Sequence, residues 1–229
     1  MLEGLKAEVC RANRALVDRG LVKLTFGNVS GIDPNRELVV IKPSGVPYGG
    51  LVPEQMSVVD LEGNVVEGDL KPSTDTPTHV IIYKHFEVVE GITHAHSRFA
   101  TAFSQAQREI VCYGTTHADH FYGPVPVTRP LTRDEVEKGY EANTAHVILE
   151  RFEGIDPAQM PAVLVAGHGP FAWGKNATES LDNAVALETV AEMALVTEML
   201  RPDSSALQQH LLDKHHQRKH GNDAYYGQD

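Results

Sequence analysis

The sequence predicts a single α/β domain, and three observations lead to that fold class. The chain has 229 residues, the size of one ordinary α/β domain, and no low-complexity linker or internal repeat divides it. Hydrophobic residues make up 41% of the chain, which is enough for a core. Short runs that alternate as strands are interleaved with amphipathic segments of helical period. We therefore treat residues 1–229 as one domain.

The first half of the chain begins with a helix signal. Residues 2–19 carry apolar side chains at helical spacing and stop at Gly20, which suits a helix C-cap. A second helix is expected from Pro77, a residue favoured in the first helical turn, to Phe86. Alternating apolar residues and turn signals predict the strands of this half, which are 21–26, 37–41 and a hairpin over 56–66.

The second half contains two capping signatures. Thr132–Glu135 and Asn176–Glu179 each place a capping side chain three residues before a glutamate, so long helices are expected to run to about Arg151 and Leu200. The remaining elements expected in this half are short helices over 98–107 and 205–220 and strands over 109–113 and 161–167.

A histidine pair follows an apolar run, Val88, Val89 and Ile92, that predicts a buried strand. Residues i and i+2 of a strand share one face, so His94 and His96 point the same way with Cα atoms roughly 6.6 Å apart. Two imidazoles at that separation can bind one divalent metal ion.

A third histidine offers a further ligand. His168 directly follows the apolar run 161–167. It lies between two glycines, which let the backbone turn sharply beside it. Three histidines leave a position for water or substrate, which is typical of catalytic rather than structural zinc. The alternative is coincidence, since the chain has 12 histidines.

Composition excludes several classes of protein. The formal net charge of −11 argues against nucleic acid as a partner. No apolar run approaches the roughly 20 residues of a membrane span, and the first residues lack the pattern of a signal peptide. Cys10 and Cys112 have no C-x-x-C spacing, so we expect neither a disulfide framework nor a thiolate zinc site. These features predict a cytoplasmic enzyme or small-molecule binder.

Three polar loops follow predicted strands: Gly27-Asn28, Lys42–Gly45 and Lys71–Thr74. Each offers backbone amides near Gly or Pro, or hydroxyl groups, and two add a lysine, as a phosphate site requires. Each loop alone could equally be ordinary turn chemistry. Asp75 follows the third loop and could be a metal ligand, a base or a helix N-cap.

Two later segments carry further candidates. Asp119 lies in a polar stretch and could act as a general acid or base, or be an ordinary loop carboxylate. The basic run Lys214–His220 could serve only as cations at a helix C-terminus. Tyr225 and Tyr226 in the tail suggest docking, for example on a neighbouring subunit.

Seven sequence blocks in a fixed order support a resemblance to a known family. They are T-F-G-N-V-S, I-K-P-S-G-V, K-P-S-T-D-T-P-T-H, T-H-A-H-S-R, G-T-T-H-A-D, G-H-G-P-F-A-W-G-K-N-A and L-L-D-K-H-H-Q-R-K-H-G. Together they resemble the class II sugar-phosphate aldolase family and, within it, the L-ribulose-5-phosphate 4-epimerase branch. The likeness covers nearly the whole chain.

The resemblance implies a fold and a site. The fold would be a central, mostly antiparallel sheet with helices on both sides, assembled as a four-fold symmetric homotetramer with sites between subunits. The implied zinc ligands are His94, His96 and His168, with Asp75 at or beside the metal. The implied phosphate-binding residues are Gly27, Asn28, Ser44, Gly45, Ser73 and Thr74, supported by Lys42. The residues implied to reach over from the neighbouring subunit are the acid/base pair Asp119 and Tyr226, with His215 and Arg218 matching positions that line the same site.

The implied activity interconverts L-ribulose 5-phosphate and D-xylulose 5-phosphate by breaking and re-forming the C3–C4 bond. One alternative is an aldolase of the same family acting on another sugar phosphate, although Asp75 matches the epimerase branch rather than the glutamate of the aldolases. Another is a non-catalytic binding member, against which the three intact histidines argue. The pathway, whether arabinose, ascorbate or another pentose route, stays open.

Overall fold

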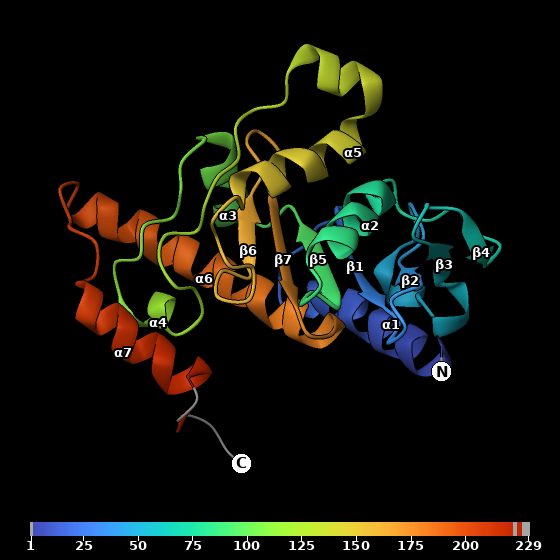
Figure 1. Cartoon of the computed structure of the whole chain (residues 1–229), viewed down its shortest axis with the longest axis horizontal. Coiled ribbons are helices and arrows are strands. Elements are labelled where there is room, and N and C mark those ends of the chain that lie inside the picture. The colour runs from blue at the N-terminus through green and yellow to red at the C-terminus, as the bar shows by residue number, and fades with distance from the viewer. Residues whose placement is uncertain (1, 222–223, 226–229) are drawn as a thin grey trace.

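A seven-stranded sheet forms the centre of the molecule, in a computed structural model that describes residues 2–221 and 224–225 (Figure 1). The strand order is β4-β3-β2-β1-β5-β7-β6, and every ladder between these strands is antiparallel. The strands are β1 (Gly27–Ile32), β2 (Leu38–Ile41), β3 (Ser57–Asp60), β4 (Val65–Glu67), β5 (Gly91–Ala95), β6 (Ala162–Leu164) and β7 (Pro170–Gly174). This arrangement confirms the predicted α/β fold class.

Helices cover both faces of the sheet (Figure 1). They are α1 (Leu2–Asp18), α2 (Thr76–His85), α3 (Arg98–Gln105), α4 (Thr115–Ala118), α5 (Arg133–Arg151), α6 (Ala177–Leu200) and α7 (Gln209–His220), with short 3₁₀ turns η1 (Tyr48–Gly50) and η2 (Pro53–Gln55). Among the described helices, none is long and apolar enough to cross a membrane.

Alternation along the central strands decides which side chains meet which helices. Thr93 of β5 is hydrogen-bonded to Ser180 of α6, with 2.8 Å between the two hydroxyl oxygens. Ser30 of β1 points to the other face, where its hydroxyl lies 2.7 Å from Nδ1 of His79 in α2. Because successive strand residues point to opposite faces, His94 shares the α2 side of the sheet. The α2 side is therefore the one that can carry chemistry.

The capping residues predicted for three helices are confirmed. The Thr132 hydroxyl accepts a hydrogen bond from the Glu135 amide, and the Glu135 carboxylate accepts one from the Thr132 amide, at 3.3 and 2.7 Å. At the start of α6, the Asn176 side chain accepts from the Glu179 amide at 2.8 Å. Gly20, with φ +71°, follows α1 as a left-handed C-terminal residue.

The predicted strand over 21–26 is wrong. Phe26 and Gly27 donate their amides to the carbonyls of Lys23 and Thr25, so this segment turns back on itself. Leu24 has φ +50° and is exposed. The first strand instead begins at Gly27, because its partner β5 ends opposite that residue and offers earlier residues no ladder.

The predicted strand over 109–113 is also wrong. Only Ile110 pairs, through a two-bond bridge with Val125. Val125 lies between Pro124 and Pro126, and proline has no amide with which to continue a ladder. Asp119 consequently follows the one-turn helix α4, rather than a strand.

Other elements also differ from the prediction. Of residues 161–167, only Ala162–Leu164 are a strand, and the turn beyond them leads into β7, which the sequence did not predict. The last helix begins at Gln209 rather than at 205. The register of β7 against β5 matters most for the site, because it pairs Phe171 with His94.

We predict that Gly91→Ala destabilises the fold by about 2–3 kcal/mol. A Cβ at Gly91 would lie 2.1 Å from the carbonyl oxygen of Asn176, so β5 and the start of α6 would have to separate. Gly4→Ala is the matched control, because nothing lies within 4 Å of its Cβ position and alanine favours a helix. Urea unfolding measures both variants; equal stability of the two would contradict the packing described.

Candidate active site

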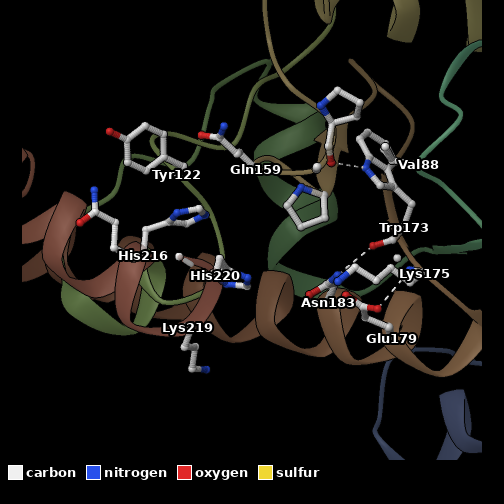
Figure 2. Close-up of a pocket in the computed structure, with 16 residues that line it drawn as sticks. Val88, Tyr122, Gln159, Trp173, Lys175, Glu179, Asn183, His216, Lys219 and His220 are labelled. Atoms are coloured by element: carbon white, nitrogen blue, oxygen red, sulfur yellow. Dashed lines mark hydrogen bonds between the residues drawn. The ribbon is translucent and has the colours of Figure 1, made fainter. Parts of the chain in front are cut away.

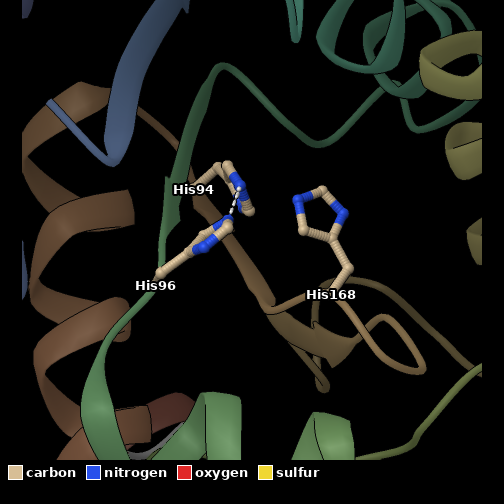
Figure 3. Close-up of side chains that lie close together, drawn as sticks. All are labelled: His94, His96 and His168. Carbon is tan, nitrogen blue, oxygen red and sulfur yellow. Dashed lines mark hydrogen bonds between the residues drawn. The ribbon is translucent and has the colours of Figure 1, made fainter.

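Three histidines converge on the α2 side of the sheet (Figure 3). His94 lies on β5, His96 directly follows β5, and His168 lies in the turn between β6 and β7. One ring nitrogen of each residue lies within 4.8 Å of the other two, and Nε2 of His94 is 3.2 Å from Nε2 of His96. No other group of three metal-ligating side chains occurs among the described residues.

The surroundings set the protonation of this histidine cluster. Nδ1 of His94 lies 2.9 Å from the carbonyl oxygen of Pro170, so Nδ1 carries the proton and Nε2 offers its lone pair to the cluster. The His94 ring stacks on Phe171 with 4.2 Å between centroids. Burial lowers the pKa of His168 to about 3, and repulsion from His94 and His96 adds to that effect. Neutral rings with converging lone pairs fit a divalent metal ion.

Tight turns make room for the cluster. Gly167 has φ +72°, and the Val165 amide donates to the Gly169 carbonyl at 3.0 Å across the turn. A Cβ on Gly169 would lie 3.3 Å from Cδ2 of His96 and 3.6 Å from Cε1 of His94. The two glycines beside His168 therefore let the chain turn close beside His94 and His96.

The three polar segments meet at one cavity beside the histidines, but Gly27-Asn28 begins β1, so the loop predicted there is wrong and only the other two are loops. Two of them pair with each other: the Ser44 amide donates to Lys71 and the Ser73 amide to Lys42, at 2.9 and 3.0 Å. This pairing uses two amides that the sequence offered to a phosphate. The amides of Gly45 and Thr74 donate to no group among the described residues. The cavity has a volume of about 400 Å³, within the range of small-molecule sites.

Asn28 joins the start of β1 to the Lys71–Thr74 loop and to Asp75. Its Nδ2 donates to Oδ2 of Asp75 at 2.7 Å and to Oγ of Ser73 at 3.0 Å. Burial alone would raise the pKa of Asp75, but the nearby His94 and His79 rings and the Asn28 hydrogen bond lower it. Asp75 therefore faces the cavity as an anion, beside but outside the group of three histidines. Its side chain does not cap α2.

Lys42 is a buried cation at the floor of the same cavity. Its side chain is 2% exposed, and its Nζ donates to the Pro43 carbonyl at 3.1 Å. Among the described residues, no carboxylate lies within ion-pair distance of it. Burial lowers the pKa of Lys42 to about 8. A buried ammonium without a counter-ion favours an anionic ligand.

Sequence reasoning missed two cavity residues on α5. Tyr140 and Glu141 line the cavity, and the Tyr140 ring lies 5.8 Å from that of His168. They reach it because α5 is kinked at Gly139, which has φ +153° and non-helical geometry. A glycine inside a helical pattern was the available signal. Burial, followed by the charges of Asp75 and Glu141, raises the pKa of Tyr140.

Asp119, His215 and Arg218 form a separate polar cluster between α4 and α7. Arg218 donates to both carboxylate oxygens of Asp119 at 2.9 and 2.6 Å, and Nδ1 of His215 lies 3.1 Å from the same carboxylate. Burial would raise the pKa of Asp119, but these bonds lower it. None of the three lines the histidine cavity of its own chain. Tyr226 lies outside the described residues.

A larger cavity of about 630 Å³ lies elsewhere, between α7 and the far end of β7 (Figure 2). Several of its polar side chains are already hydrogen-bonded within the protein. Asn183 donates to the Trp173 carbonyl, and the Trp173 indole donates to the Pro157 carbonyl. Glu179 accepts from the Lys175 amide. This cavity lacks the convergent ligands of the smaller one, so we assign the candidate active site to the smaller one.

Comparison with known proteins gives consistent matches. A family model described as the class II aldolase and adducin N-terminal domain matches residues 7–195. Over its full length the chain is 49% identical to a Mycoplasma pneumoniae protein named probable L-ribulose-5-phosphate 4-epimerase UlaF, of which 96% is covered. A solved L-fuculose 1-phosphate aldolase superposes with a TM-score of 0.79 at 25% identity, covering 94% of this chain and 95% of the other. Another, from Thermus thermophilus, has a TM-score of 0.70 at 26% identity, covering 88% of this chain and 99% of the other.

We predict that Arg218→Met makes the protein less stable near neutral pH by about 1–2 kcal/mol. The pKa of Asp119 is lowered in the fold, so its ion pair stabilises the protein above the ordinary carboxyl pKa of about 3.9 and is lost as pH falls through the lower folded pKa. The difference from the unmodified protein should therefore shrink below about pH 4. Urea unfolding between pH 3 and 7 measures it.

The control for this prediction is Lys138→Met, which breaks an exposed ion pair with Asp134 one helical turn away. Such pairs contribute little, so its stability should change by less than about 0.5 kcal/mol at every pH. A pH-independent loss in Arg218→Met would show that the arginine acts by packing alone.

Proposed function

The chain belongs to the class II aldolase and adducin family, and we propose that it is a metal-dependent L-ribulose-5-phosphate 4-epimerase. It interconverts L-ribulose 5-phosphate and D-xylulose 5-phosphate within one catalytic domain, residues 1–229, in the cytoplasm. One observation carries the proposal: the three histidines and the loops around buried Lys42 line a single cavity. A relative 49% identical over the whole chain bears this name.

The metal proposed for this site is zinc, held by His94, His96 and His168 with Asp75 beside it. Three neutral imidazoles are a catalytic zinc pattern, because a further position stays open. When bound there, the ion would supply Lewis acidity toward the sugar. The Asn28 side chain holds the Asp75 carboxylate in place by donating a hydrogen bond to its Oδ2.

The phosphate group of the substrate is proposed to lie among the three polar segments. The amides of Gly45 and Thr74, and the hydroxyls of Ser44 and Ser73, would bond its oxygens, and the Lys42 ammonium would balance its charge. Gly27 and Asn28 complete this site on the strand side. Both ends of the substrate can therefore be held at once, one at the histidines and one at the loops.

The chemistry follows from the position of the inverted carbon. In a 2-ketopentose, C4 is β to the carbonyl, so its own proton is not acidic and cannot be removed to invert the centre. Removing the proton of the C4 hydroxyl instead lets the C3–C4 bond break, and its electron pair moves onto the C2 carbonyl as an enediolate. The remaining aldehyde, glycolaldehyde phosphate, is kept by the phosphate loops while it rotates. Attack on its other face restores the bond with inverted C4.

Two proton-transferring groups are needed, one for each face of the aldehyde. Asp119 and Tyr226 match the acid/base pair of the family, and His215 and Arg218 would orient Asp119. Asp119 lies outside the histidine cavity of its own chain, which supports a site completed by a neighbouring subunit. We therefore propose a homotetramer with its sites at the subunit interfaces.

A class II aldolase acting on another sugar phosphate is the second candidate. Two solved L-fuculose 1-phosphate aldolases superpose on the chain, so the same fold also serves an aldolase reaction. Asp75, shorter than the glutamate expected in aldolases, and the name of the 49% identical relative favour the epimerase. A purely binding role would leave the histidine cluster without a purpose.

A product analysis tests the proposed reaction. We expect zinc-loaded protein to convert L-ribulose 5-phosphate into xylulose 5-phosphate, because the phosphate loops keep the aldehyde fragment. An aldolase would release glycolaldehyde phosphate and dihydroxyacetone instead. Carbon-13 spectroscopy of the mixture separates these outcomes, and a zinc-free sample is the control. Fragments as the main products would overturn the epimerase assignment.

A mixing experiment tests the shared site. His96→Ala should lose zinc and activity, and Asp119→Asn should lose turnover but keep zinc. After the two inactive proteins exchange subunits at equal concentrations, about a quarter of the interfaces should combine an intact metal site with an intact Asp119, and a similar fraction of activity should return.

The control mixture combines Asp119→Asn with Tyr226→Phe. If both groups come from the same neighbour, every interface then contains one defect and no activity should return. Mass spectrometry of isotope-labelled chains verifies subunit exchange in both mixtures. Exchange without recovery in the first mixture would mean that Asp119 acts within its own chain.

A further inference from the structure

The ammonium of Lys42 lies over an aromatic ring that the proposed reaction does not use. Its Nζ is 4.8 Å from the ring centroid of Tyr48, at the start of the 3₁₀ turn η1. Both side chains are buried, Lys42 at 2% and Tyr48 at 4% exposure. The face of an aromatic ring attracts a cation without neutralising it, and this attraction is strongest away from water.

The hydroxyl end of the same ring reaches the start of β1, a second part of the proposed phosphate site. The Tyr48 phenol donates to the Gly27 carbonyl at 2.7 Å. Gly27 begins β1 and lies so close to β5 that a Cβ there would be 2.7 Å from the His94 carbonyl oxygen. The next residue is Asn28, which holds Asp75 and Ser73. The phenol therefore fixes the point at which β1 enters the site.

The third segment is connected through Lys42 itself. The Lys42 carbonyl accepts the Ser73 amide at 3.0 Å, and Pro43 forms a bridge with Pro72. Tyr48 thus contacts Lys42 and Gly27 directly, and it is linked to Ser73 of the third segment through Lys42. Burial raises the pKa of Tyr48, so its phenol stays protonated and is suited to holding groups in place rather than to transferring protons.

We propose that Tyr48 is a positioning residue that sets the affinity of the site for the substrate phosphate, by holding the Lys42 ammonium and the Gly27 carbonyl at a fixed separation. A carboxylate in its place would also hold the lysine but would neutralise it and repel the phosphate. The aromatic face restrains the flexible lysine chain and leaves its charge for the ligand. This inference rests on the proposed function, which assigns the phosphate to these loops.

Two variants separate the two contacts of Tyr48. Tyr48→Phe keeps the ring under Lys42 and removes the bond to Gly27, whereas Tyr48→Leu removes both. We expect the KM for L-ribulose 5-phosphate and the dissociation constant of inorganic phosphate to rise about threefold in the first and about tenfold in the second. Because Tyr48 is neither a proposed metal ligand nor a proposed proton-transferring group, kcat should change less than about threefold. Calorimetry of zinc-loaded protein measures phosphate binding.

The matched control is Tyr113→Phe, which removes a phenol bonded to Glu198 away from the cavity. Phosphate affinity and KM should not change in it. Unchanged phosphate affinity in both Tyr48 variants would overturn the proposal.

A double-mutant cycle distinguishes positioning from a general structural role. In a Lys42→Met background, Tyr48→Leu should weaken phosphate binding only about threefold, the effect of the lost Gly27 bond, rather than about tenfold, since the charge that the ring restrains is gone. Undiminished loss in that background would mean that Tyr48 acts by packing, and would overturn the inference. Binding of inorganic phosphate needs no turnover. A protein that follows this pattern but makes no xylulose 5-phosphate would refute the proposed reaction and leave the positioning role standing.

Discussion

The register of β5 between β1 and β7 is the constraint on which the site depends. It places His94 opposite Asn28 on one side and opposite Phe171 on the other. A slip of one residue would turn His94 toward α6 and Thr93 toward the cavity, because strand side chains alternate between faces. Close contact between Gly91 and the start of α6 helps to hold this register. His94 is thus positioned by a fully buried interior strand of the sheet, and His96 directly follows it.

The protonation state of each titratable group in the site depends on the environment in which the fold places it. Burial lowers the pKa of His168 and keeps its ring neutral, while the neighbouring His94 and His79 rings and the Asn28 hydrogen bond lower the pKa of Asp75. Lys42 lines the same cavity, with a ring face rather than an acid beside it. A positive charge and imidazole lone pairs are therefore present in one cavity. The proposed substrate, with a chelating end and an anionic end, suits this combination.

A single chain does not bring all the candidate groups together. The histidines and loops form one group on the sheet, and Asp119 with Arg218 forms another between α4 and α7. Both groups are ordered by their own hydrogen bonds within the chain, so neither needs the other to take shape. Assembly would then join two preformed halves at a modest entropic cost. The proposed site at a subunit interface would therefore need little further ordering when subunits meet.

Local sequence determined much of this protein. The capping residue Thr132 predicted where α5 begins, and the H-x-H spacing of His94 and His96 predicted their shared direction, because both effects act within a few residues. Only the tertiary structure decided that residues 21–26 do not pair, since a strand needs a partner that pattern alone cannot supply. It also decided that Tyr140 reaches the cavity and that Tyr48 contacts two of its polar segments. Their positions depend on a helix kink and a loop path set by packing between segments distant in the sequence.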